Sequence, residues 1–169
     1  MLKEYVETGS VSSRIELVGI VDVSKLEYVG IEAPCAIADI GDSMGQTLPR
    51  LHRIVTDNAL ETSGPPGSIY HDYDMKAHTC HYTSFAPTRS AVEVSGATSG
   101  AIEPCKALKV IHTGSYEHLG NAWSTGMAYQ RHKKLKPLKG QPPFELYTSD
   151  PEHTPAPDIV TEIYLPLRT

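Results

Sequence analysis

The chain repeats its own pattern at an offset of 79 residues, and this repeat limits the possible folds more than any other feature. The matched positions are mostly apolar, with a shared glycine and a shared proline: Ile31 and Val110, Ile40 and Leu119, Gly41 and Gly120, Met44 and Trp123, Leu48 and Met127, and Pro87 and Pro166. Mid-unit, Tyr70 matches Tyr147 at an offset of 77, which indicates a two-residue insertion or deletion. We interpret the pattern as an internal duplication.

Each unit shows the same order of predicted elements, namely strand, helix, strand, strand. In the first unit, a helical stripe of apolar residues begins at Ile40 and contains Pro49, which should either kink the helix or place its start near Thr47. The other predictions here are strands at 14–23, 26–31, 69–71 and 77–87, a turn at 63–67 and a loop at 72–74.

The second unit begins after a segment of small residues, 95–100. Ser115 is a good N-cap for a helix whose apolar stripe runs through Leu119, Trp123 and Met127. The predicted strands are 108–112, 144–147 and 159–167, with a turn at 140–143 and a loop at 148–157.

Neither unit could bury its own sheet face alone, so we expect the two to associate about a pseudo-twofold axis. The sequence thus predicts an α+β fold of duplicated βαββ units, with an antiparallel sheet, helices on one face and a central cleft. Residues 1–25 would form an N-terminal arm and an extra strand. Residues 26–168 would form a single domain made of repeats 26–87 and 105–168.

Charge and composition narrow the possible functions. A net charge of -5 and a pI of about 5.9 argue against a dedicated nucleic-acid binder, which needs a basic face. No apolar run approaches the roughly 20 residues of a membrane span, and residues 1–30 lack a secretion signal, so we expect a cytoplasmic protein. Cys35, Cys80 and Cys105 have no CxxC spacing, which makes a disulfide framework or structural zinc site unexpected.

The last predicted strand carries an acid in an apolar setting. With a period of two, one face holds Ile159, Thr161, Ile163, Leu165 and Leu167, and the other holds Val160, Glu162, Tyr164 and Pro166. An ionised Glu162 between a valine and a tyrosine would lose hydration unless it met a cation, a metal or several donors. We therefore take Glu162 as the centre of a binding site. The alternative is a strand whose second face is simply exposed to water.

Three motifs of the second unit resemble a known family. They are Lys109-Val-Ile-His-Thr-Gly-Ser-Tyr-Glu-His-Leu-Gly120, Glu145-Leu-Tyr-Thr-Ser-Asp-Pro151 and Thr161-Glu-Ile-Tyr-Leu-Pro166. Together they resemble the GyrI-like small-molecule-binding domain, which also forms the effector-binding part of AraC-type and MerR-type multidrug-responsive regulators. The resemblance covers 105–168 well and 26–87 mainly through the repeat. It implies a duplicated βαββ fold and a cleft for hydrophobic, often cationic, molecules.

The resemblance also implies which residues form the site. By motif position Glu162 is the acid on the last strand, and Tyr147 and Tyr116 are aromatic positions of the cleft. Trp123, on the adjacent helix, and Tyr164 complete the expected ligand-binding set. Tyr164, like Tyr70 and Tyr82, could line the cleft or fill the core. No cofactor or metal is expected.

Three functions stay open. The first is a binder of small hydrophobic or cationic molecules, in which Glu162 supplies the opposite charge and the tyrosine faces add cation–π attraction. The second, suggested by enzyme-like relatives in the family, is a hydrolase of electrophilic or strained-ring compounds. It would use Glu162 with Tyr147 or Tyr116. The third is a protein–protein modulator, for instance of a topoisomerase.

We expect a monomer or homodimer without a DNA-reading or membrane-binding element, because no helix-turn-helix fits before residue 26.

Two other signals carry less weight. Ser43 lies in a G-x-S-x-G pattern, but the repeat aligns that stretch with an ordinary helix start at Gly120. Metal-type ligands occur at His71, His78, Cys80 and His81, but on a strand they do not share one face in a tetrahedral spacing.

The residue equivalent to Glu162 in the first unit is Thr83, so a paired-carboxylate mechanism is not supported.

Overall fold

The computed structural model describes residues 13–168 of the chain. Its strands are β1 (Ser13–Val23), β2 (Leu26–Ala36), β3 (Gly67–Asp74), β4 (Thr79–Thr88), β5 (Thr98–Ile102), β6 (Cys105–Gly114), β7 (Phe144–Tyr147) and β8 (Val160–Leu167). The α-helices are α2 (Ile40–Asp57) and α3 (Leu119–His132), and short 3₁₀ turns occur at η1 (Ile37–Asp39), η2 (Tyr116–His118) and η3 (Ala156–Asp158).

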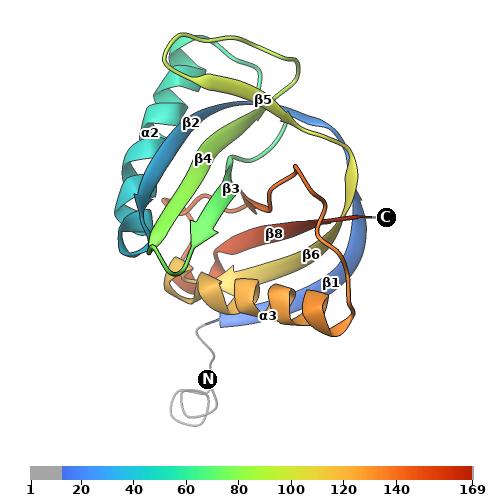
Figure 1. Ribbon diagram of the computed structural model, residues 1–169. Helices are drawn as coiled ribbons and strands as arrows, with labels where there is room; N and C mark the ends of the chain where they lie inside the picture. The colour runs from blue at the N-terminus through green and yellow to red at the C-terminus, as the bar shows by residue number, and fades with distance from the viewer. Residues whose placement is uncertain (1–12, 169) are drawn as a thin grey trace.

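The strands form one eight-stranded antiparallel sheet in the order β1-β6-β8-β7-β3-β4-β2-β5. Figure 1 shows that the sheet curves strongly, with α2 beside the half that contains β2 and β4, and α3 beside the half that contains β6 and β8. The halves meet where β3 pairs with β7, over Gly67 with Leu146, Ser68 with Glu145 and Ile69 with Phe144. This short pairing is the joint of the fold.

Both helices cover the same face of the sheet. Leu51 of α2 packs with Val29 and Ile31 of β2, while Ala122 of α3 packs with Val110 of β6 and Ile163 of β8. Since side chains alternate between faces along a strand, the register places these strand residues and Glu145 on one side, which we call the helix-covered face. The opposite face has its own core, which contains Ile69, Phe85, Phe144, Val23 and Ile102.

The α+β class, the antiparallel sheet and the placement of both helices on one face agree with the predicted fold. Each half reads strand, helix, strand, strand, and the strand order β6-β8-β7 is mirrored by β2-β4-β3 across the joint. This arrangement is what a duplication about a pseudo-twofold axis requires. The duplication itself stays a prediction, as do the boundaries of the two repeats.

Two local predictions need correction or a decision. Helix α2 begins at Ile40 and passes through Pro49, so Pro49 is not its start. Strand β3 continues through the predicted loop to Asp74, because a register shift after Tyr70 lets pairing resume. The turn closes beyond it, where Asp74 Oδ1 accepts the backbone N–H groups of Lys76 and Ala77.

Strand β5 was not predicted, because its Gly-, Ser- and Thr-rich sequence has no apolar alternation. It pairs with β2, and Gly100 lets the Tyr28 side chain lie close, because a Cβ atom there would lie 2.5 Å from the Tyr28 hydroxyl oxygen. The expected N-terminal arm falls mostly outside the described residues. Neither α-helix in residues 13–168 is long and apolar enough to cross a membrane.

The close approach at the joint predicts a sharp difference between two glycine substitutions. A Cβ atom on Gly67 would lie 2.0 Å from the backbone oxygen of Glu145, whereas a Cβ atom on Gly45 of α2 would meet nothing within 4 Å. We expect Gly67→Ala to lower the free energy of unfolding by about 3 kcal/mol, and Gly45→Ala to raise it by about 0.5–1 kcal/mol. Urea denaturation measures both values. Equal stability of the two variants would contradict the tight β3–β7 joint.

Candidate functional site

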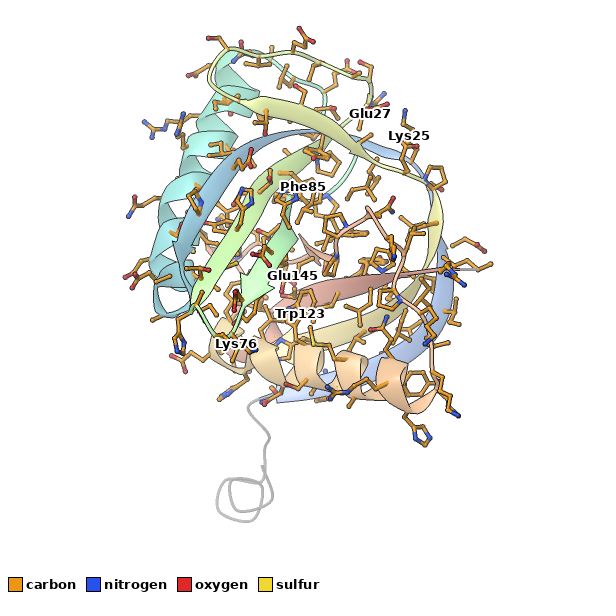
Figure 2. The ribbon with its side chains drawn as sticks, viewed as in Figure 1. Lys25, Glu27, Lys76, Phe85, Trp123 and Glu145 are labelled. Carbon is orange, nitrogen blue, oxygen red and sulfur yellow. The ribbon has the colours of Figure 1, made fainter. Side chains whose placement is uncertain are left out.

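A fully buried carboxylate lies at the joint of the two half-sheets. Glu145 of β7 is only 1% exposed, and three side chains donate hydrogen bonds to it. Trp123 Nε1 bonds Oε1, while the hydroxyls of Tyr147 and Tyr70 lie 3.0 Å and 3.1 Å from Oε2. In Figure 2, Glu145 lies near the middle of the sheet and Trp123 lies toward α3. The donors therefore come from β3, β7 and α3, and all converge on one acid.

The alternation of β7 explains how the acid comes to be buried. Phe144 and Leu146 point to the opposite face, where Phe144 belongs to the apolar core. Glu145 and Tyr147 consequently point to the helix-covered face. There the Cα partner of Glu145 across the joint is Ser68, which is itself fully buried. The result is a polar centre that the helices shield from water.

Further hydrogen bonds lie around this centre and between α2 and the sheet. The hydroxyl of Ser68 lies 2.9 Å from that of Tyr147, and donates to it because the Tyr147 proton is directed to Glu145. Two residues of α2 bond to the adjacent strand β4. The Thr47 hydroxyl lies 2.8 Å from that of Ser84, and the Ser43 hydroxyl lies 2.6 Å from that of Tyr82. Ser43 thus holds α2 against the sheet, a structural role that agrees with discounting it as a nucleophile.

Burial dominates the electrostatics of the centre. It raises the pKa of Glu145 above the ordinary value of 4.5, although the bonds from Trp123, Tyr147 and Tyr70 oppose the shift. Burial and the nearby Glu145 also raise the pKa of both tyrosines well above 10, so each phenol keeps its proton and remains a donor. Within residues 13–168, no lysine, arginine or histidine forms an ion pair with Glu145.

Aromatic rings surround the carboxylate. The rings of Tyr70 and Trp123 meet edge to face with centroids 5.3 Å apart, and those of Tyr116 and Tyr147 do the same at 5.9 Å. Tyr82 lies 6.4 Å from Tyr70 on the same side. Glu145 and Tyr147 are 1% and 8% exposed, so side chains close the region between the helices where a cleft was expected. Tyr116, at 39% exposed, is the most accessible of these rings.

The structure divides the predicted site residues between the two faces of the sheet. Tyr147, Tyr116 and Trp123 gather around Glu145 on the helix-covered face. Glu162 and Tyr164 lie on the opposite face, because the Cα partner of Glu162 in β7 is Leu146 and not Glu145 or Tyr147. The sheet therefore separates Glu162 from Tyr147 and Tyr116, and one small molecule cannot contact both sets.

Glu162 has its own cation on that opposite face. Its Oε1 lies 2.7 Å from Lys109 Nζ, and its Oε2 lies 2.5 Å from the Tyr164 hydroxyl. Burial disfavours the charge of Lys109, but hydrogen bonds to Glu162 and Tyr164 outweigh burial and raise the pKa of the ammonium group. Lys109 and Tyr164 also line a cavity of about 280 Å³ together with Leu26, Phe144 and Leu146. A ligand-binding role for Glu162 in this setting stays a prediction.

Glu145 was quoted within a motif but was not singled out from the sequence. Two signals point to it. It is the one acid in the apolar run from Phe144 to Tyr147. In addition, the offset of 77 that matches Tyr70 with Tyr147 also matches Ser68 with Glu145, the two residues that are Cα partners at the joint. In the predicted duplication, a residue that pairs with its own repeat equivalent would lie next to the pseudo-twofold axis.

The histidines considered as metal ligands have other partners. His81 Nε2 lies 2.6 Å from Glu32 Oε1, and His71 Nε2 lies 2.7 Å from the Thr83 hydroxyl. Both lie on the face opposite Glu145, because Thr83 and Glu32 are cross-strand partners that share the face of Ile69. His81 therefore does not approach the buried carboxylate.

The comparisons with known proteins identify the family. The GyrI-like small molecule binding domain matches residues 18–168, and the chain belongs to this family. No curated protein sequence matches the chain significantly. The match agrees with the resemblance seen in the three motifs.

Several solved structures share the fold at low identity. The EcmrR C-terminal domain matches with a TM-score of 0.78 and 16% identity over 94% of this chain and 99% of that one. In the EcmrR–DNA complex the same score and identity cover 99% of this chain but only 62% of EcmrR. The structure of SAV2435 bound to tetraphenylphosphonium matches with a TM-score of 0.65 and 14% identity over 88% of this chain and 92% of that one. A Listeria innocua hydrolase encoded by lin2189 matches with a TM-score of 0.59 and 14% identity over 98% of this chain and 97% of that one.

The raised pKa of Glu145 predicts a pH dependence of stability. Because the folded protein keeps this proton above pH 4.5, where the unfolded chain loses it, the stabilisation is present at low pH and is lost as the pH rises through the folded pKa. Glu145→Gln cannot lose a proton. The free energy of unfolding of the wild type relative to this variant should therefore fall as the pH rises above about 4.5.

Urea denaturation at several pH values checks this expectation. Glu162→Gln is the matched control, since it removes a carboxylate that has a cation partner on the opposite face. A constant difference in the free energy of unfolding between wild type and Glu145→Gln over the whole pH range would show that burial does not raise the pKa of Glu145.

Proposed function

We propose that this domain binds lipophilic organic cations at the helix-covered face, with the Glu145 carboxylate as the counter-charge. The observation that supports the proposal is a fully buried acid that has three hydrogen-bond donors and no cationic partner among the described residues. A buried charge is stabilised best when it is both hydrogen-bonded and paired. An incoming cation would supply the missing half of that pair.

The surrounding rings favour a particular kind of cation. A delocalised, apolar cation loses little hydration on entering an aromatic site, and each ring face adds about 0.5–2 kcal/mol of cation–π attraction. Tyr70, Trp123 and Tyr147 offer such rings within hydrogen-bond reach of the carboxylate. A small hydrated cation such as sodium would gain much less there. The ligand class is thus defined by low hydration and a spread positive charge.

Access requires a movement of side chains. The carboxylate is closed off from water, and Trp123 bonds it directly from α3. We propose that the ligand displaces the indole of Trp123 and takes its place beside Glu145. Such displacement reduces the affinity by the cost of opening the site, but it also excludes ligands too weakly attracted to open it. The similar fold of SAV2435 in complex with tetraphenylphosphonium agrees with this ligand class.

The proposal is limited to ligand binding by this domain. Both α-helices among residues 13–168 pack on the sheet, so this part of the chain presents no separate helix pair of the helix-turn-helix type. We expect the domain to act as an effector-binding unit that reads no DNA sequence itself.

A titration with tetraphenylphosphonium tests the proposal directly. Trp123 is the single tryptophan of the chain, so its fluorescence should change as the ligand displaces it from Glu145. Glu145→Gln keeps the size of the side chain but removes its charge. It should weaken binding by about 10- to 100-fold, while Glu162→Gln should bind like the wild type. Equal binding by wild type and Glu145→Gln would rule out the counter-charge, and a loss confined to Glu162→Gln would move the site to the opposite face.

A hydrolase is the second candidate, favoured by the contact between an acid and a phenol. Glu145 could take a proton from water while Tyr147 or Tyr70, both within 3.1 Å of Oε2, donates a proton to a leaving oxygen or nitrogen. Glu145 replaces Glu162 in this scheme, because the sheet separates Glu162 from Tyr147 and Tyr116. The Listeria innocua hydrolase with a similar fold is consistent with this second candidate.

Turnover of a strained-ring or isothiocyanate substrate distinguishes the two candidates. Catalysis by the pair predicts a rate above buffer that falls at least about 100-fold in both Glu145→Gln and Tyr147→Phe. The measurement is product formation followed by chromatography. A rate that these variants leave unchanged would dismiss the hydrolase, and cation binding alone would then describe the site.

A further inference from the structure

A pair of free cysteines faces each other across two neighbouring strands, on the helix-covered face. Cys35 of β2 and Cys80 of β4 are direct Cα partners in the antiparallel register. Cys80 is buried at 1% exposed, and Cys35 is partly exposed. The two side chains point to the same face of the sheet, as cross-strand partners do. Neither the proposed binding of cations nor the second candidate function uses them.

The ladder fixes the geometry of this pair. The N–H of Ile37 bonds the carbonyl of His78 at 3.0 Å, so these opposed residues form a hydrogen-bonded pair. Hydrogen-bonded and non-hydrogen-bonded pairs alternate along an antiparallel ladder. Pro34, which has no N–H to donate, is paired with His81 at a non-hydrogen-bonded position, in agreement with this alternation. Cys35 and Cys80 are therefore also a hydrogen-bonded pair, with Cα atoms about 5.5 Å apart, inside the disulfide range of about 4.4–6.8 Å.

We propose that Cys35 and Cys80 are an oxidation site at which hydroperoxides close a reversible cross-strand disulfide. The sulfur of Cys35 attacks one peroxide oxygen, the O–O bond breaks, and Cys35 sulfenic acid and an alcohol (or water) form. The sulfur of Cys80 then attacks the sulfenic sulfur, the S–O bond breaks and water leaves. Two thiols lose two electrons in total, and the peroxide gains them.

Exposure and acidity set the order of the two steps. Cys35 is the more accessible thiol, so it meets the peroxide first. Burial and the adjacent Cys35 raise the pKa of Cys80 to about 11, which keeps Cys80 protonated near neutral pH and makes it a poor first nucleophile. The second step should consequently be slow at neutral pH and faster in alkaline solution. Sulfenic acid on Cys35 should accumulate before the bridge closes.

The position in the sheet favours a reversible bridge. In a hydrogen-bonded pair the Cβ atoms lie at the long end of the cross-strand range, about 5.5 Å, so closure must draw the strands together and leaves strain. β5 pairs with β2 only over Leu26–Gly30, so β2 beyond that point has β4 as its only strand partner among the described residues. This end of β2 can shift more easily than a central strand. A strained bridge is readily reduced by thiols.

The third cysteine serves as an internal control. Cys105 begins β6, and β8, β7 and β3 lie between β6 and β4 in the sheet. It cannot bridge to Cys80 without unfolding. Trypsin should release the three cysteines on separate peptides, 26–50, 77–89 and 90–106, so each pairing can be identified by mass.

Peroxide treatment of the full reduced chain, followed by alkylation and mass spectrometry, tests the inference. The expected result is a loss of about 2 Da, linkage of peptides 26–50 and 77–89, and recovery of both thiols with dithiothreitol. Cys105→Ser should behave like the wild type. Cys35→Ser, a change at a partly exposed position, should abolish the intramolecular bridge, and Cys80→Ser should leave Cys35 sulfenic acid that dimedone traps. A monomer whose three thiols stay free, or a bridge that includes Cys105, would overturn the inference.

Discussion

The burial of one carboxylate at the joint of two half-sheets is the constraint on which the structure of this site depends. Glu145 is placed on the helix-covered face by the alternation of β7, and Trp123, Tyr70 and Tyr147 supply its hydrogen bonds. Burial favours the protonated acid, while the three donors favour the carboxylate. A cation from outside would shift this balance toward the charged form. Under the proposed function, the contacts that hold the fold together at its centre would also favour a positively charged ligand.

The two faces of the sheet differ in whether their acid has a cationic partner. On the face opposite the helices, Lys109 already neutralises Glu162 at 2.7 Å, and Tyr164 completes the set. On the helix-covered face, the aromatic rings leave Glu145 without such a neighbour among the described residues. This difference, and not the number of acids, is what makes one face the stronger candidate for binding a cation. Because that face is closed, the proposed binding would require side chains to move.

Much of the fold follows from the sequence, because the repeat carries the pattern of strand, helix, strand and strand. Period-two alternation also correctly divided the last strand, with Glu162 opposite to Ile163. Alternation cannot say which face of a neighbouring strand an acid will share, since that depends on the register of β7 with β8. The family resemblance grouped Glu162 with Tyr147, but a one-residue difference in phase puts the two side chains on opposite faces. Strand β5 was missed because its sequence has no apolar alternation: Gly100 lies against Tyr28, and the hydroxyls of Thr98 and Ser99 donate to backbone carbonyls of Gly30 and Val92.

The most direct measurement is the ionisation of Glu145 itself, followed by ¹³C NMR of side-chain carboxyl carbons, with the Glu145 signal assigned through the Glu145→Gln spectrum. The account predicts that the free protein titrates this carboxyl above pH 4.5 and that saturating tetraphenylphosphonium shifts the titration to lower pH, because the cation stabilises the charged form. The Glu162 signal should move little. A Glu145 titration that the cation leaves unchanged, or a shift seen at Glu162 alone, would contradict the central claim.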